Sequence, residues 1–160
     1  TDNLDHEIEI DLGIPANMPE NYISDLSIRL EVYQRLLDIY SVDQLEDLRE
    51  ELVDRFGAIP IQVENLIFLI RLKIFAKKAG IVSIIRENHV LTFGLEQETG
   101  SSKIALQKAL GNQVQVGNKQ INWNFENLNS EWQNELINLI NQLVTFREKF
   151  NALFSTSRGV

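Results

Sequence analysis

The hydrophobic pattern changes from a helical period to alternation at Gly80, and that change is the strongest constraint on the fold. Between residues 25 and 79, apolar side chains recur every three or four residues, which is typical of amphipathic helices. From Ile81 to Phe125 they alternate with polar residues, as in strands with one buried face. Helices followed by hairpins predict an α+β fold with an antiparallel sheet rather than βαβ winding.

Local signals divide the first half into a strand and three helices. The strand is expected at residues 6–12, where Ile8, Ile10 and Leu12 alternate with acidic residues. Ser41 and Gln44 have the spacing of a capping box, in which each side chain satisfies a free N–H at the helix start. Gly57 is expected to end the same helix, because glycine adopts a left-handed conformation without strain. The three helices are predicted from Asp25 or Ser27 to about Tyr40, from Ser41 to Gly57, and from Pro60 to Ala79.

The second half predicts two hairpins and a closing helix. Between the hairpins we expect a loop over residues 94–100 and a short helix capped by Ser101 or Ser102. Ser130 and Gln133 form a second capping box before the long final helix, which should continue to about Leu153. The strands are predicted at residues 81–86 and 90–93, and then on either side of Gly117-Asn118, at residues 114–116 and 121–125.

Length and composition predict a single domain, residues 1–160 with a core at about 6–154. The 160 residues are enough for a hydrophobic core, and 44% of them are hydrophobic. We expect the helical half to pack on the sheet and the long C-terminal helix to close the fold. The chain begins at Thr1 and its one methionine is Met18. We therefore expect a fragment of a larger multidomain protein.

Charge and cysteine content restrict the environment and the partners. The chain has no cysteine, which fits a reducing compartment. Its apolar runs are short, so no membrane span is predicted, and its acidic N-terminus does not resemble a signal peptide. A net charge of −8 disfavours binding of nucleic acid by this chain alone. We expect the isolated chain to be a monomer.

No motif for catalysis or for cofactor binding is recognisable. The histidines, His6 and His89, have no neighbour at metal-ligand spacing, and no phosphate-binding glycine motif is present. We therefore predict no catalytic residue, no metal and no cofactor in this domain. An enzyme that uses Asp and Glu as acid and base stays an alternative, if separated carboxylates meet across a pocket.

One basic cluster offers a second alternative. Arg71, Lys73, Lys77 and Lys78 lie in the second half of the third predicted helix. Cations in a last helical turn also offset the negative end of the helix dipole, which is the simpler interpretation. An accessory nucleic-acid-binding module would use the same four residues.

The acidic face of the second predicted helix is the main candidate for recognition. With the leucines of this helix and Val53 directed inward, the 3.6-residue period places the acids on the opposite face. That face either serves solubility or docks on arginines of a partner, which pair with carboxylates in a bidentate manner. Arg55 lies at its edge and can pair with an acid of the partner or with Glu51. The candidate docking residues are Asp47, Glu50, Glu51, Asp54 and Arg55.

Five segments carry a resemblance to a known family. They are EIDLGIP (9–15), PENYISD (19–25), RLEVYQR (29–35), ELVDRFG (51–57) and AKKAGI (76–81). In this order and spacing they resemble the C-terminal domain of bacterial transcription-repair coupling factors. The resemblance is dense from about Ile8 to Ile81, and beyond that it rests on the order of elements.

The resemblance implies a regulatory role. The family's proteins are DNA translocases that use ATP and Mg²⁺, displace stalled RNA polymerase and recruit the excision nuclease through UvrA. Their C-terminal domain packs on an N-terminal module similar to UvrB and covers the surface that UvrA needs. The segment ELVDRFG takes part in that contact, which carries over to Glu51, Asp54 and Arg55. The resemblance therefore favours docking: a non-catalytic, autoinhibitory interaction domain whose partner is the UvrB-like module of the same polypeptide, with UvrA, RNA polymerase and DNA as indirect partners.

Overall fold

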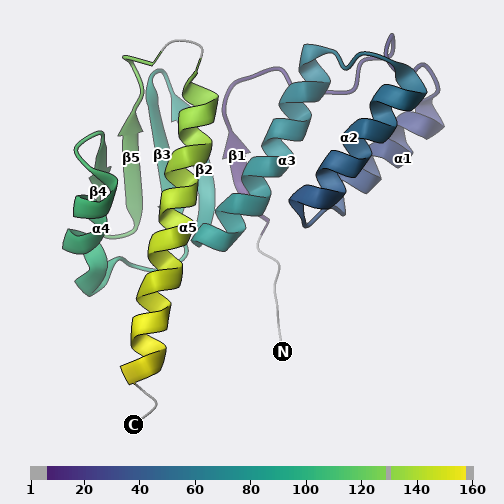
Figure 1. The fold of residues 1–160 in the computed structure, drawn as a ribbon. Coiled ribbons are helices and arrows are strands. Elements are labelled where there is room, and N and C mark those ends of the chain that lie inside the picture. Colours follow the sequence, from purple (N-terminus) through teal and green to yellow (C-terminus); the bar gives the residue numbers. More distant parts are fainter. Residues whose placement is uncertain (1–6, 129–130, 158–160) are drawn as a thin grey trace. The chain divides into compact units, whose positions relative to one another are not determined.

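The structure is a computed structural model and describes residues 7–128 and 131–157 (Figure 1). Contacts within the chain divide it into two compact units. One contains Gly13–Ile74, and the other contains the chain from Phe75 onward together with the strand that precedes Gly13. The prediction of one domain over residues 1–160 stays a prediction.

Three helices form where the sequence predicts them: α1 (Leu26–Leu37), α2 (Val42–Phe56) and α3 (Ile61–Ala79). Asp25 caps α1, since its Oδ1 accepts a hydrogen bond from the Ile28 N–H at 3.2 Å. α1 ends at Leu37, three residues before the predicted end at Tyr40. The reason is the next cap: the Tyr40 N–H donates to Gln44 Oε1 at 3.1 Å, so Tyr40 already belongs to the start of α2.

The ends of α2 explain its length. Ser41 Oγ accepts from the Gln44 N–H at 3.2 Å, which confirms the first half of the capping box. Gly57 follows the helix with φ +87° and ψ −159°. This conformation has the predicted positive φ, but its ψ lies outside the left-handed helical region, in a region that is essentially restricted to glycine.

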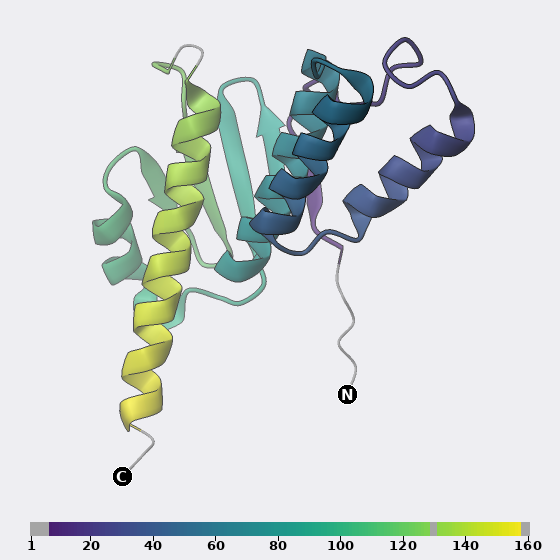
Figure 2. The same ribbon diagram turned by 45° about the vertical axis from the view of Figure 1, so that its right-hand side comes forward.

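The unit Gly13–Ile74 has its own hydrophobic core. Val32 and Leu36 of α1, and Leu45, Leu48 and Leu52 of α2, pack with side chains of α3 as far as Ile74. In Figure 2, α1 and α2 are the two dark blue helices joined by a short turn. Val53 does not join this core: its side chain is exposed, which corrects the prediction that it points inward. It lies a quarter of a turn from Leu52, at the margin of the buried stripe.

The other unit contains a five-stranded sheet in the order β1-β2-β3-β5-β4. Neighbours β2–β3, β3–β5 and β5–β4 are antiparallel, as predicted, whereas β1, which is not part of the predicted hairpins, pairs with β2 in parallel. A parallel pair needs a long connection, and the three helices between β1 and β2 supply it. The strands are β1 (Glu9–Asp11), β2 (Ile81–Glu87), β3 (Val90–Leu95), β4 (Val114–Val116) and β5 (Gln120–Asn124).

Two helices accompany the sheet, α4 (Lys103–Leu110) and α5 (Trp132–Ser157), and α5 lies across one face of it (Figures 1 and 2). On β3 and β5 the buried side chains share a face, since Leu91 is paired with Trp123. Gly94 and Leu95 belong to β3, although a loop is predicted there. A 3-10 turn (Gly100–Ser102) precedes α4, and Ser102 Oγ donates to the Thr99 carbonyl instead of capping the helix. Ser130, of the predicted capping box, lies outside the described residues.

Candidate interaction surface on the second helix

The buried side of α2 fixes its position within its unit. Leu45, Leu48 and Leu52 are at most 3% exposed. They recur every three or four residues and therefore lie on one side of the helix. The opposite side remains available to solvent.

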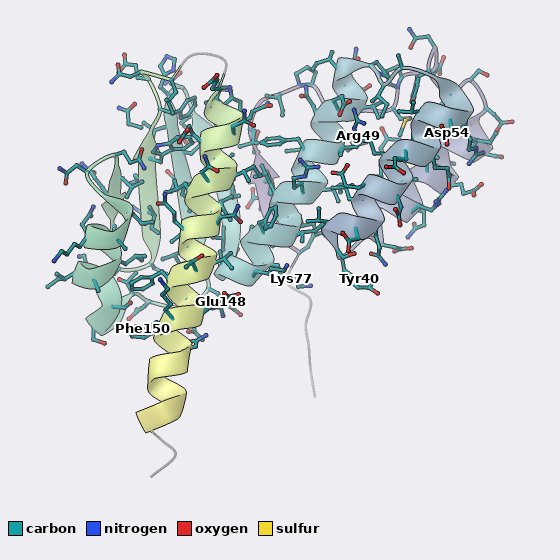
Figure 3. The ribbon with its side chains drawn as sticks, in the orientation of Figure 1. Tyr40, Arg49, Asp54, Lys77, Glu148 and Phe150 are labelled. Atoms are coloured by element: carbon teal, nitrogen blue, oxygen red, sulfur yellow. The ribbon has the colours of Figure 1, made fainter. Side chains whose placement is uncertain are left out.

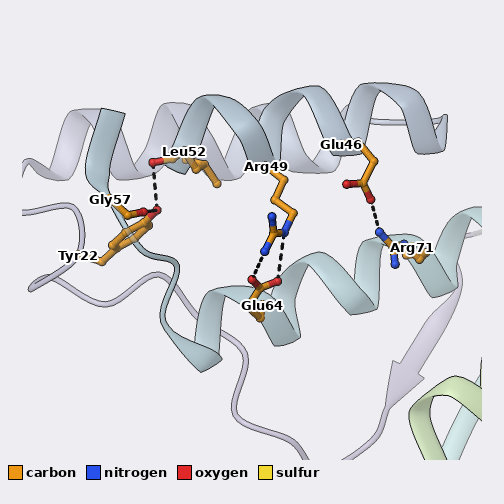
Figure 4. A network of polar contacts seen from close by, with 7 residues as sticks. All are labelled: Tyr22, Glu46, Arg49, Leu52, Gly57, Glu64 and Arg71. Carbon is orange, nitrogen blue, oxygen red and sulfur yellow. Dashed lines mark hydrogen bonds and ion pairs between the residues drawn. The ribbon is translucent and has the colours of Figure 1, made fainter. Parts of the chain in front are cut away.

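Two ion pairs join α2 to α3 beside this core, and Figure 4 shows both. Arg49 Nη2 lies 2.5 Å from Glu64 Oε1, and its Nε lies 3.4 Å from Glu64 Oε2, so the contact is bidentate. Two turns of α3 further on, Arg71 Nη2 donates to Glu46 Oε1. Glu46 and Arg49 are thus held by α3, which leaves the other charged residues of α2 to form its outer face.

Tyr22 secures the C-terminal end of α2. Its hydroxyl lies 3.2 Å from the Leu52 carbonyl oxygen and 3.3 Å from that of Gly57 (Figure 4). Burial raises the pKa of this hydroxyl, so it stays protonated and can donate at neutral pH. Its ring meets that of Phe56 edge to face, with centroids 5.8 Å apart. The segment 51–57 is therefore held in place from its inner side.

The outer face of α2 carries exposed carboxylates. Asp47, Glu50 and Asp54 are all exposed, and none of the three forms an ion pair within the described part of the chain. Asp43, one turn earlier, is exposed as well. Figure 3 labels Asp54, the last of these residues. We call the row Asp43, Asp47, Glu50 and Asp54 the acidic stripe.

Glu51 differs from its neighbours because two arginines already bind it. Arg35 of α1 makes a bidentate contact, with Nη1–Oε2 at 2.5 Å and Nη2–Oε1 at 2.9 Å, and Arg55 Nη1 lies 3.1 Å from Oε2. The hydrogen bonds from Arg35, followed by those from Arg55, lower the pKa of Glu51 from 4.5 to about 2. The helical period predicts Glu51 on the free face, but Arg35 comes from another helix and pairs with it. Its carboxylate is therefore not a free acid.

The sequence allows Arg55 to pair with an acid of a partner or with Glu51, and in the structure it pairs with Glu51. Besides its contact with Glu51, its guanidinium lies 4.9 Å from the centroid of the Phe56 ring. The Arg55 side chain is 40% exposed. The outer face of α2 therefore presents the acidic stripe beside a positive edge formed by Arg35 and Arg55.

A depression of about 350 Å³ lies between α1 and α2. Asp38, Asp47 and Glu51 line it together with Arg35. A general acid or base at neutral pH needs a pKa near 7, whereas Glu51 is held ionised far below that value. Glu51 is therefore not poised to exchange a proton near neutral pH.

The remaining candidates are placed as follows. His89 is exposed in the β2–β3 turn, with its ring centroid 6.0 Å from that of Phe125, and His6 lies outside the described residues. In the basic cluster, Arg71 is paired with Glu46, and Lys78 Nζ lies 5.9 Å from the centroid of the Phe75 ring.

Within residues 7–128 and 131–157, no group of three or more His, Cys, Asp or Glu side chains can hold a metal ion. None of the helices in these ranges combines the length and the hydropathy of a membrane span.

Arg35, Arg49 and Tyr22 shape this surface, and sequence reasoning does not single them out for it. Each acts on a residue that is 15 to 30 positions away. A helical period reveals only neighbours on the same helix. The available signal is that Tyr22 and Arg35 lie in two of the segments that carry the family resemblance.

Comparisons with known proteins agree on one family. The model of the TRCF domain family matches residues 12–106. The transcription-repair-coupling factor of Staphylococcus haemolyticus (strain JCSC1435) is 30% identical over 119 residues, which are 71% of this chain and 10% of that protein. The protein of the same name from Staphylococcus aureus (strain USA300) is 30% identical over 116 residues, 69% of this chain and 10% of that protein. The chain thus spans about a tenth of the length of the curated relatives it matches.

A solved structure shows the same fold. The crystal structure of the C-terminal domain of transcription-repair coupling factor aligns with a TM-score of 0.74 at 24% identity, covering 89% of this chain and 95% of that chain. The expected α+β class is confirmed by this match. Because the family model covers more than half of the chain and includes α2 with its acidic stripe, this chain belongs to the TRCF domain family.

Proposed function

We propose that this chain is a non-catalytic docking domain of a bacterial transcription-repair coupling factor, acting in the cytoplasm in transcription-coupled repair. The outer face of α2 binds the N-terminal UvrB-like module of the same polypeptide and masks the surface that UvrA requires. ATP and Mg²⁺ serve the motor part of the parent protein, and this domain needs neither.

The observation that carries the proposal is the acidic stripe itself. Asp47, Glu50 and Asp54 are exposed without an ion pair in the described part of the chain, on a helix whose opposite side is fixed by a core and two ion pairs. Carboxylates held on a rigid helix lose little conformational freedom when a basic partner binds. Such a surface is suited to arginines and lysines of a partner.

Glu51 and Arg55 have different tasks in this proposal. Glu51 already holds two guanidinium groups, so we assign it a positioning role: it keeps Arg55 beside the stripe. Arg55 then offers a cation to an acid of the partner. A surface with both signs fixes the register of docking better than a wholly acidic one.

Linkage within one polypeptide makes weak docking effective. A tethered partner is present at an effective concentration of about millimolar, so a modest affinity suffices to keep the masked state populated. Ligands that favour the open state shift this equilibrium, and we propose that RNA polymerase and DNA do so through the parent protein.

The test is a charge reversal in the full-length parent protein. The variant Asp47→Lys, Glu50→Lys, Asp54→Lys should bind UvrA more tightly than wild type by about tenfold or more, because repulsion from the basic module opens the masked state. UvrA binding is measured by titration with labelled UvrA.

A matched control changes the net charge equally on the other unit. Glu87, Glu98 and Glu126 are also exposed, and their replacement by lysine should leave UvrA binding masked. Unmasking by both triple variants would show that net charge, not the stripe, is responsible. Full masking in the stripe variant, with its melting temperature unchanged, would refute docking through α2.

A further inference from the structure

α1 has an apolar stripe on a side that its own core does not use. Leu26, Leu30 and Leu37 are 60%, 59% and 55% exposed, although leucine is usually buried. At 3.6 residues per turn these three positions lie within about 40° of one another. Tyr40, just after the helix, is 77% exposed and extends from the turn between α1 and α2 (Figure 3).

This stripe is rigid, because α1 is fixed on its other sides. Val32 and Leu36 are buried in the core of the unit at 1% and 2% exposure. Tyr33 ties α1 to the preceding segment, since the Met18 N–H donates to its hydroxyl oxygen at 2.7 Å. Single exposed leucines are common on protein surfaces, but a row of three on one helix face, continued by a tyrosine, is characteristic of a binding surface.

The charged groups around the stripe determine what can cover it. Two exposed acids that form no ion pair in the described part of the chain border α1: Glu31 along it and Asp38 at its end. The two arginines of α1 already have partners: Arg29 donates to two backbone carbonyls at 2.8 and 3.2 Å and lies 3.8 Å from Glu20, and Arg35 binds Glu51. The border of the apolar stripe is therefore acidic.

We infer that the α1 stripe is a docking site for an amphipathic helix whose apolar side chains are flanked by lysine or arginine. The leucines contact the apolar face of this helix, and Glu31 and Asp38 pair with its cations. The three leucines span about 16 Å at 1.5 Å per residue, so three turns of the partner helix cover them. A second copy of this chain is disfavoured, because two acidic borders would meet.

The inference uses residues of α1 and does not rest on docking through α2. Its test uses the whole chain and three stapled helical peptides, each fluorescently labelled. The first has leucines at helical spacing flanked by lysines, the second has glutamates in place of those lysines, and the third has glutamines in place of the leucines. We expect the Leu/Lys peptide to bind saturably below about 1 mM, and the other two to bind at least about tenfold more weakly.

Variants of the chain locate the site. Leu30→Gln with Leu37→Gln should weaken binding of the Leu/Lys peptide about tenfold or more, and Leu26→Gln alone should give a smaller loss. Glu31→Gln with Asp38→Asn should weaken binding of the same peptide by several-fold. All these positions are exposed, so melting temperatures should stay unchanged. Ile104→Gln, at a residue of α4 that is 84% exposed, is the matched control and should bind as wild type.

Four outcomes would overturn the inference. They are equal affinity of wild type and the Leu30/Leu37 variant, equally tight binding of the Leu/Glu peptide, no saturable binding of any peptide, and a wild-type dimer in sedimentation that the same leucine variant abolishes. The last result would identify a second copy of the chain as the occupant.

Discussion

Leu52 and Val53 are neighbours in sequence but lie in opposite surroundings. Leu52 is fully buried in the core between the helices, whereas Val53 is 39% exposed. Replacement of a buried leucine by alanine loses its transfer free energy and leaves a cavity. We expect Leu52→Ala to lower the free energy of unfolding by about 2–5 kcal/mol, and Val53→Ala to change it by less than about 0.5 kcal/mol. Urea unfolding of the three proteins measures both values, and similar losses would contradict the assigned burial.

The Glu51 carboxylate makes a pH-dependent contribution to stability. Its pKa is lowered to about 2 in the folded chain by the hydrogen bonds from Arg35 and Arg55, so its contribution is complete above the unfolded-state value of about 4.5 and is lost as pH falls towards 2. A third of this side chain is exposed, and screening keeps the contribution at about 0.2–1 kcal/mol. The difference in free energy of unfolding between wild type and Glu51→Gln should therefore be largest above pH 5 and shrink below it.

Subtraction of the Glu51→Gln curve removes the effect of the other carboxylates, which titrate in both proteins. A difference that stays constant between pH 5 and pH 2.5 would mean that the Arg35–Glu51 contact does not stabilise the ionised form of Glu51.

The contact between Arg35 and Glu51 could not be predicted from the sequence. The helical period places Glu51 on the outer side of α2, yet its strongest partner is 16 residues away on a different helix.

At the scale of elements, Gln107 covers the edge of the sheet that β4 forms. β4 is the last strand in the sheet order, and the Gln107 amide of α4 replaces a further strand. Its Nε2 donates to the Val114 carbonyl at 2.9 Å and its Oε1 accepts from the Val116 N–H at 2.9 Å. An open edge would expose these groups to pairing with another chain.

Gln107→Ala should expose this edge. We expect faster hydrogen exchange at the Val116 amide and concentration-dependent association in sedimentation, because the two backbone groups lose their partner. Gln115→Ala, at an exposed residue of β4 itself, is the control and should change neither measurement. Unchanged exchange at Val116 in the Gln107 variant would show that the side chain does not protect the edge.

Elements are predictable from the sequence where their signals are local. The start and end of α2 follow from Ser41, Gln44 and Gly57, which lie within or beside the helix. The pairing of β1 with β2 has no local signal: alternation in residues 6–12 predicts a strand and one buried face, but not a partner about 74 residues away or the parallel direction. The start of the short helix α4 is also not predictable in detail. Two serines suggest a side-chain cap, but Ser102 at the N-cap position makes no capping hydrogen bond.

At the scale of the whole molecule, the family follows from the sequence, and the surface chemistry requires coordinates. The five resembling segments suffice to identify the family, since spacing and order are properties of the sequence. Which acids of α2 are free is decided by arginines from α1 and α3, and these contacts form only when the unit folds. The exposed stripe on α1 is not predictable from the sequence for a similar reason. Its leucines cannot be distinguished from core residues without the structure, which shows that the core lies on a different side of the helix.

Salt separates the two docking surfaces in the complete protein. Screening shortens the reach of exposed charges from about 10 Å at 0.1 M salt to about 3 Å at 1 M, whereas apolar contact is hardly weakened. If the acidic stripe on α2 binds the UvrB-like module, the affinity of this chain for that module should fall several-fold between about 0.05 M and 0.5 M salt. A variant with Asp47→Asn, Glu50→Gln and Asp54→Asn should bind more weakly at low salt and show a flatter dependence. If the affinity of this variant still falls as steeply with salt as that of the wild type, the charges that bind the module lie outside the acidic stripe. If binding does not depend on salt and Leu30→Gln abolishes it, the module binds the α1 stripe instead.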